Sequence, residues 1–121
     1  IDLGYSLVAY ADALAWKQDL AQAFDYYRQG YELRKSLALA DPQNQFPRRS
    51  LMYPNRELGV VALRLNRWDD LAKAVEELAW QRQIGVTVEA TDEGVFAYFR
   101  GMLAAARGGD ACPHLLEASQ W

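Results

Sequence analysis

The sequence predicts an all-α fold built from stacked helical hairpins, and three observations support that expectation. Residues 7–23 align with residues 58–74 at an offset of 51, with seven identities across the window. Apolar residues recur at steps of three and four, the period of a helix with one buried face. Gly, Pro, Asn and Asp residues separate the apolar segments. Because a repeated helical unit buries its apolar face by stacking on the next unit, we expect five to six helices in a single domain covering residues 1–121.

The first unit is expected over residues 3–40 as two helices. An apolar stripe at steps of four, three and four marks the first helix: Leu3, Leu7, Tyr10 and Leu14. Asp19 stands directly before the second helix, where its carboxylate is predicted to act as the N-cap. That helix should be long, because only Gly30 could interrupt it before Asp41. Pro42 disfavours helix at Asp41 and ends it.

The second unit is expected over residues 47–84. Pro47 fits the first turn of a helix. Pro54 lies inside a stretch that otherwise reads as one helix from about 47 to 66, so the pattern predicts a kink or a break there. Asp70 precedes Leu71 as Asp19 precedes Leu20, and it is predicted to cap the second helix of this unit.

A third unit is expected over residues 91–120. Thr91, Asp92 and Glu93 form a capping-like cluster at its start, and residues 85–89 read as the loop before it. Its first helix should end at Gly108 and Gly109. A short last helix is expected from Pro113 to about Gln120.

The residues of the first unit resemble a known family. The segment 26–37 (YYRQGYELRKSL) is followed by 40–44 (ADPQN) and preceded by the turn 17–23 (KQDLAQA). Together these are similar to bacterial tetratricopeptide repeats with a lengthened second helix. The family pattern has a small residue in the first helix, matched by Ala11 and Ala62, and an alanine early in the second, matched by Ala23 and Ala74. The resemblance implies a right-handed α-α superhelix whose first helices line a concave groove.

Composition narrows the function classes. The chain has 121 residues, 51% hydrophobic and 24% charged, which is typical of a folded globular chain. Its formal net charge of −3 argues against general binding to nucleic acid or to anionic membranes. No apolar run approaches the ~20 residues that span a bilayer, so no membrane insertion is predicted. The single cysteine, Cys112, excludes an internal disulfide framework and fits a cytoplasmic location. Because the first residue is Ile1, the chain is expected to be a fragment of a larger protein.

The sequence offers little catalytic chemistry. His114 is the only histidine, and a Cys/His arrangement would have to use it with Cys112, which lies two residues earlier with Pro113 between them. A zinc site normally needs about three or four protein ligands, so packing or capping is the favoured role of this pair. No Gly-rich phosphate-binding loop is present. We therefore predict no enzyme activity, no catalytic residues, no metal and no cofactor.

The resemblance allows groove positions to be proposed one at a time. They are Tyr5, Val8, Asp12 and Trp16 in the first unit, Arg56, Gly59, Leu63 and Arg67 in the second, and Phe96, Phe99, Arg100, Leu103 and Arg107 in the third. For Phe99 and Tyr98 core packing is the favoured alternative. Some members of the family hold a peptide carboxylate with Lys and Asn at such sites. The residues here do not supply that set, so a clamp of that kind is not expected.

Three functions remain open from the sequence. The favoured one is a protein-interaction scaffold that binds a peptide or a partner domain in the concave groove. The alternatives are a regulatory or scaffolding arm of a larger signalling enzyme, and a small-molecule-binding helical domain. Self-association is also predicted, because the two ends of the chain are apolar, at Ile1, Leu3, Leu115, Leu116 and Trp121.

Overall fold

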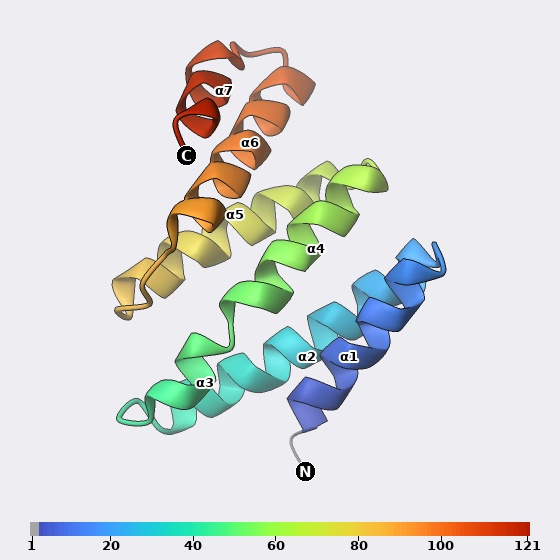
Figure 1. Cartoon of the computed structure of the whole chain (residues 1–121), viewed down its shortest axis with the longest axis vertical. Coiled ribbons are helices and arrows are strands. Elements are labelled where there is room, and N and C mark those ends of the chain that lie inside the picture. The colour runs from blue at the N-terminus through green and yellow to red at the C-terminus, as the bar shows by residue number, and fades with distance from the viewer. Residues whose placement is uncertain (1–2) are drawn as a thin grey trace.

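The computed structural model describes residues 3–121, which form a stack of helices (Figure 1). The helices are α1 (Leu3–Trp16), α2 (Leu20–Ala40), α3 (Gln45–Arg49), α4 (Met52–Arg64), α5 (Trp68–Gln83), α6 (Ala90–Ala106) and α7 (Cys112–Ser119). Every regular element in the described range is helical, so the predicted all-α class is confirmed. Six of these helices have eight residues or more, within the predicted five to six, and α3 adds a helix of five residues. In residues 3–121, no helix is both long enough and apolar enough to cross a membrane.

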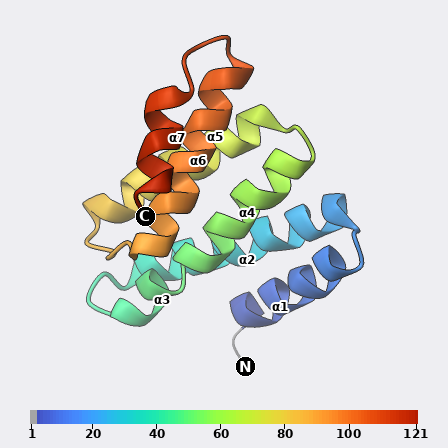
Figure 2. The ribbon, with the colours of Figure 1, turned by 45° about the horizontal axis from the view of Figure 1, so that its top comes forward.

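The helices pair as three hairpins in chain order, and the hairpins stack along the long axis of the molecule (Figures 1 and 2). α1 packs on α2, α4 on α5, and α6 on α7. Between hairpins, the second helix of one contacts the first helix of the next: α2 packs on α4, and α5 packs on α6. The first and second helices of successive hairpins therefore alternate along the stack.

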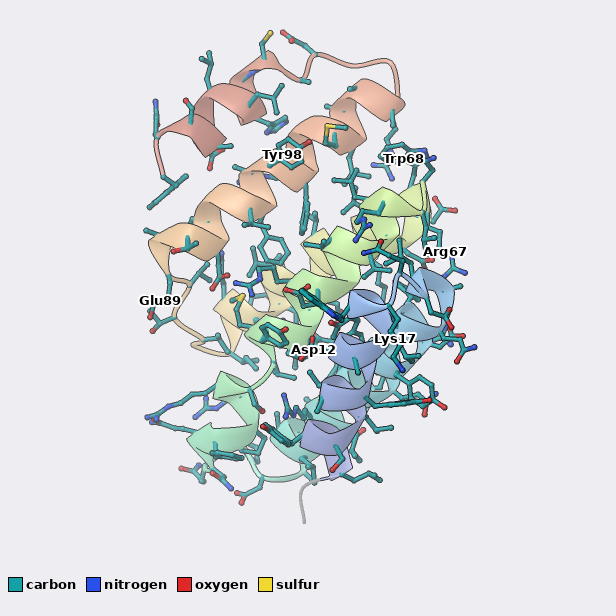
Figure 3. The ribbon with its side chains drawn as sticks, turned by 45° about the vertical axis from the view of Figure 1, so that its right-hand side comes forward. Asp12, Lys17, Arg67, Trp68, Glu89 and Tyr98 are labelled. Carbon is teal, nitrogen blue, oxygen red and sulfur yellow. The ribbon has the colours of Figure 1, made fainter. Side chains whose placement is uncertain are left out.

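The three hairpins turn in the same way. The first helix of each ends beside a residue in the left-handed conformation, namely Gln18 (φ 67°), Asn66 (φ 57°) and Gly108 (φ 76°). In each turn the next residue's N–H donates to the carbonyl oxygen five residues earlier, at N···O distances of 2.9, 2.8 and 2.7 Å. These bonds satisfy carbonyls that the end of a helix leaves free. In Figure 3, Lys17 and Arg67, which flank the first two turns, lie on the same side of the molecule.

The turns define a repeat register that differs from the one predicted. Gln18 and Asn66 are 48 residues apart, whereas the sequence alignment uses an offset of 51. A buried small residue lies seven positions before each turn: Ala11, Gly59 and Gly101. The structural counterpart of Ala11 is therefore Gly59, and not Ala62 as predicted. A shift of three residues is close to one helical turn, so it leaves the apolar stripe on nearly the same face, and the sequence alone could not separate the two registers.

Two predicted caps are also corrected. Asp19 occupies the N-cap position of α2, but its side chain makes no capping hydrogen bond. Asp70 lies inside the first turn of α5, whose N-cap position is held by Arg67. In the shifted register the α4–α5 turn comes three residues earlier than predicted, so Asp70 is already part of the helix. Its carboxylate there still lies near the positive end of the helix dipole.

The other predicted boundaries agree with the structure to within a few residues. The chain leaves helix at Ser50 and Leu51, between α3 and α4, which is the predicted interruption; Pro54 itself lies in the first turn of α4. α2 ends at Ala40 as predicted from Pro42. Residues 85–89 are non-helical, and α6 begins just after them.

The core contains a polar connection between second helices as well as apolar packing. Tyr27, Phe96, Leu51 and Leu71 are among the buried apolar side chains. Tyr31 of α2 donates to Glu77 Oε1 of α5 at 2.9 Å, and Lys35 Nζ lies 2.6 Å from the same oxygen. Because a buried carboxylate is costly without partners, these two donors account for the position of Glu77 and join the first two hairpins.

Candidate partner-binding groove

A groove runs between α4 and α6, with the last residue of the chain along one edge. Its volume is about 480 Å³. The residues that line this α4–α6 groove are Val60, Leu63 and Arg64 of α4, Thr91, Gly94, Val95, Tyr98 and Phe99 of α6, and Trp121. Most of these side chains are apolar or aromatic, so the groove is suited to bind apolar groups.

The α4 wall follows from helix geometry. Val60, Leu63 and Arg64 occupy positions i, i+3 and i+4, which project from one face of the helix. Val60 and Leu63 are half-buried, so each presents part of its surface to the groove. Arg64 Nη2 donates to Gln18 Oε1 at 2.6 Å, which connects this wall to the turn of the first hairpin.

The α6 wall is built around Phe99. Thr91, Val95 and Tyr98 lie at i, i+4 and i+7 along the rim. Tyr98 is labelled on α6 in Figure 3. Its side chain is 43% exposed. Phe99 is only 2% exposed and forms the floor. Gly59 makes room for it, because a Cβ at that position would lie 2.8 Å from Phe99 Cζ and closer still to Cε2. The missing side chain at Gly59 thus allows α6 to lie close to α4.

Trp121 reaches the groove because α7 folds back along α6. Glycines on α6 permit that approach: a Cβ at Gly101 would lie 2.8 Å from Leu115 Cδ2, and one at Gly94 would lie 3.0 Å from Trp121 Cβ. Trp121 is 56% exposed, so its ring combines contact with the protein and a free surface. Sequence reasoning missed this residue, since no repeat or periodicity connects it with α4.

A polar row connects α1 with α2 and α4. Asp12 Oδ1 accepts hydrogen bonds from the hydroxyls of Tyr27 and Tyr53, the second at 2.7 Å. Figure 3 shows Asp12 on α1 beside α4. Burial raises the pKa of both tyrosines, and the hydrogen bond to Asp12 raises each pKa further. Both phenols therefore stay protonated donors at neutral pH.

Arg56 continues this row from α4 to α6. Its guanidinium contacts Asp92 Oδ1 at 2.9 Å and Glu57 Oε1 at 3.3 Å. Burial lowers the pKa of Arg56, but the hydrogen bond to Asp92 and the charge of Glu57 outweigh it, so the net shift is upward. Burial raises the pKa of Glu57, and the charge of Arg56 partly opposes that rise. The hydrogen bonds and ion pairs of this row thus connect neighbouring helices. The donor and acceptor atoms named in them already have partners within the protein.

The structure places only two of the predicted groove residues, Leu63 and Phe99, in the α4–α6 groove. Val8, Phe96 and Leu103 are 5%, 0% and 7% exposed and belong to the core. None of the three lines the α4–α6 groove, in contrast to Phe99, so the structure assigns them to the core and not to this groove. The physical reason is that the side of each first helix facing its own hairpin partner is apolar too, and the sequence pattern does not distinguish that side from the groove side.

The predicted charged residues mostly serve other roles. Arg67 lies over the ring of Phe24 at 5.0 Å, at the turn between α4 and α5. Arg100 pairs with Glu117 of α7 at 3.0 Å, and Arg107 is the exposed C-cap residue of α6. Asp12 and Arg56 belong to the polar row described above.

The two predicted aromatic residues of α1 are both exposed. Tyr5 is 67% exposed and Trp16 is 87% exposed. Neither lines the α4–α6 groove. Tyr53, which donates to Asp12 in the polar row, was not predicted from the sequence. It lies 48 residues after Tyr5, so the 48-residue register would have placed the two tyrosines at equivalent positions.

A second, smaller cavity of about 270 Å³ lies between α2, α4 and α5. Asn55 lines it and donates from Nδ2 to the carbonyl oxygen of Ala74 at 3.1 Å. Its Oδ1 has no hydrogen-bond partner among residues 3–121 and is shielded from solvent. Glu77, another lining residue, is engaged by Tyr31 and Lys35. The Asn55 amide and the Glu77 carboxylate of this cavity therefore form hydrogen bonds between helices.

Metal-ligating residues do not gather in the part of the chain that the structure describes: no group of three or more His, Cys, Asp or Glu side chains there is arranged to hold a metal ion. Cys112 is exposed, and its backbone N–H donates to Asp110 Oδ1 at 2.9 Å. In comparisons with known proteins, no protein-family model, no curated protein and no solved structure matches the chain. The case for a function therefore depends on the groove.

Proposed function

We propose that this chain is a protein-interaction scaffold of the tetratricopeptide type that binds an apolar segment of a partner protein in the α4–α6 groove. The observation that carries the proposal is the convergence of apolar and aromatic side chains from α4, α6 and the residue after α7 on one open groove. The proposal includes binding and no catalytic step.

The size and chemistry of the groove support a peptide ligand. Its volume of about 480 Å³ lies within the ~300–1,000 Å³ typical of ligand sites. Tyr98 and Trp121 are exposed aromatic residues at its edges, and aromatic residues often supply most of the binding energy in protein interfaces. Thr91 and Arg64 add polar groups at the rim. An apolar anchor residue would bind on the Phe99 floor, with polar contacts around it.

The repeat geometry supports the family part of the proposal. The three hairpins share a turn conformation and a buried small residue seven positions before it. A small residue at the closest approach of two helices permits their tight packing and is a feature of tetratricopeptide hairpins. The proposal includes a right-handed superhelix and a cytoplasmic location.

The alternatives receive less support from the described residues. The cavity between α2, α4 and α5 offers a small molecule few polar contacts, because Glu77 is already paired and the free oxygen of Asn55 is shielded. A role as the regulatory arm of a larger signalling enzyme is compatible with the same groove. That role would change which partner the groove binds, but it would leave the location of the binding site the same.

The groove assignment can be tested by peptide selection. Random peptides displayed on phage would be selected against the wild-type chain, and the enriched peptides synthesised and measured by fluorescence anisotropy. We expect Leu63→Asp, which puts a charge into the groove, to weaken binding by about tenfold or more. Leu39→Asp is the matched control, because Leu39 is exposed on α2 and does not line the groove. Circular dichroism would verify that both variants fold.

Two outcomes would overturn the proposal. One is that the enriched peptides bind Leu63→Asp and the wild type equally. The other is that no peptide is enriched on the wild type while the folded chain is recovered intact from the selection.

A further inference from the structure

A further pocket lies between α3, the beginning of α4 and the loop of residues 85–89 that leads to α6. We call it the α3–loop pocket, and its volume is about 640 Å³. Figures 1 and 2 show α3 and this loop on the same side of the molecule. The charged residues that line the pocket are Arg48 and Arg49 of α3, Glu89 at the end of the loop, and Asp92 of α6.

Two adjacent arginines make one wall of the α3–loop pocket cationic. Arg49 is exposed, and its Nη2 donates to the neutral Oε1 of Gln45 at 3.0 Å. Arg48 is half-buried, and its Nη1 donates to the carbonyl oxygen of Ile84 at 2.9 Å, which connects α3 to the end of α5. Within residues 3–121, neither guanidinium forms an ion pair with a carboxylate. Because a guanidinium has five N–H donors, Arg49 retains donors for a ligand.

The carboxylates that line the α3–loop pocket do not cancel this charge. Asp92 is 7% exposed and is bound to Arg56 of α4 at 2.9 Å. Glu89, labelled in Figure 3, is exposed and makes no side-chain capping hydrogen bond at the start of α6. With Asp92 neutralised by Arg56, the two arginines and Glu89 leave one net positive charge in the lining. That charge suits a carboxylate better than a phosphate group, which carries about −1.5 to −2 at neutral pH.

The α3–loop pocket and the α4–α6 groove lie along the same two helices. On α4, Met52 lines the pocket and Val60 lines the groove, with Arg56 four positions from each. On α6, Asp92 lines the pocket, and Phe99, seven positions later on the same face, forms the floor of the groove. The Arg56–Asp92 ion pair therefore separates two neighbouring sites. Eight residues of helix between Met52 and Val60 correspond to about 12 Å along α4.

We infer that the partner segment bound in the α4–α6 groove also carries an acidic residue, whose carboxylate binds Arg49 and Arg48 in the α3–loop pocket. This inference rests on the proposed function and specifies the partner. An extended segment advances about 3.3 Å per residue, so a span of about 12 Å places the acidic residue about four positions from the apolar anchor. Hydrogen bonds between a guanidinium and a carboxylate are charge-assisted, and they are stronger than the bond that Arg49 makes to Gln45.

Peptide selection tests the predicted pattern. Among random peptides displayed on phage and enriched on the wild-type chain, we expect Asp or Glu about four positions from an apolar residue. In a parallel selection on Arg49→Glu, the acidic preference should disappear and the apolar preference should remain. Peptides enriched on the wild type for an apolar residue alone, without the acidic one, would overturn the inference.

Charge variants measured with one enriched peptide by fluorescence anisotropy supply the quantitative test. Arg49→Gln should weaken binding by about two- to fivefold at low salt, and the difference should shrink in high salt because an exposed ion pair is screened. Glu89→Gln removes the opposing charge, so it should tighten binding. Arg107→Gln is the matched control, because Arg107 is exposed and lines neither the α3–loop pocket nor the α4–α6 groove. Circular dichroism would verify that the three variants fold.

A change in the peptide identifies the interacting pair. Replacing its acidic residue by the corresponding amide should remove most of the effect of Arg49→Gln, since the two groups then no longer interact. If Leu63→Asp weakens binding while the Arg49 and Glu89 variants bind like Arg107→Gln, the inference is wrong and the proposed function stands. If Leu63→Asp has no effect on the same peptide, the proposed function is wrong, whatever the charge variants do.

Discussion

The first and second hairpins have the same turn but different surroundings, and the difference shows what the neighbouring hairpin contributes. Both turns place a non-glycine residue in the left-handed conformation, Gln18 in one and Asn66 in the other. Ahead of the turn, the first hairpin has Ala11 where the second has Gly59. Gly59 faces Phe99 of the next hairpin. The residue at a repeat position is therefore constrained by the adjacent hairpin as well as by its own partner helix.

Truncation at the equivalent apolar positions should produce the largest contrast. Leu51→Ala is expected to lower the free energy of unfolding by about 2–5 kcal/mol, because the side chain is fully buried and leaves a cavity. Leu3→Ala should change it by less than about 0.5 kcal/mol, because Leu3 is mostly exposed. Urea denaturation monitored by circular dichroism, at low protein concentration to limit association, measures both. Equal losses would contradict the assignment of Leu3 and Leu51 to one repeat position in different surroundings.

Exchange at the small-residue positions should produce the next largest effect. Gly59→Ala is expected to cost about 1–3 kcal/mol, since the new methyl group overlaps Phe99, which is buried and has little room to move. Ala alone would favour a helix by about 1 kcal/mol over Gly, so Ala11→Gly should also destabilise, by about that amount. Both exchanges should therefore lower the stability, but for opposite reasons. Gly59→Ala adds a methyl group that the second hairpin cannot accommodate, and Ala11→Gly removes one that the first hairpin uses. A stabilising effect of Gly59→Ala in thermal denaturation would show that α6 lies farther from α4 than described.

The smallest effect is expected at the turns. Gln18→Gly should stabilise the chain by about 0.5–1 kcal/mol, because the left-handed conformation costs Gln more than Gly and the gain exceeds the extra freedom of Gly in the unfolded chain. Asn66→Gly should stabilise less, since Asn tolerates this conformation better than Gln. Differential scanning calorimetry of the two variants, with Gly108→Ala as the converse control, provides the measurement. If Gln18→Gly proved destabilising, the left-handed assignment of this turn would be wrong.

Much of the fold could be predicted because its signals are local. The stripe that includes Leu3 and Leu7, the stop at Pro42 and the glycines at 108 and 109 act within a few residues of where they stand in the chain. The structure agrees with the ends they indicate for α2 and α6. The exact register of the repeat was not predicted, because an offset of 51 and one of 48 bring similar faces into alignment.

The groove was harder to predict than the helices. Leu63, a predicted groove residue, lines the α4–α6 groove, whereas Val8 and Phe96 are buried, and Trp121 was predicted only as part of an apolar chain end. An apolar residue on a first helix can face its own hairpin partner, the preceding hairpin, the following hairpin or solvent, and helical periodicity reports only that it shares a face with others. Trp121 enters the groove through the packing of α7 on α6, which no short-range pattern encodes.

Local sequence patterns were sufficient to predict that the chain is all-α and where its helices begin and end to within a few residues, and no recognisable catalytic motif is found among them. These properties depend on backbone preferences and on helical periodicity, which act over short distances along the chain. The tertiary structure alone decided that Gly59 admits Phe99, that the groove lies between α4 and α6, and that Leu51 is covered where Leu3 is open. Those properties depend on which surfaces meet in space, and the same apolar side chain becomes core, groove or edge according to the helix that packs against it.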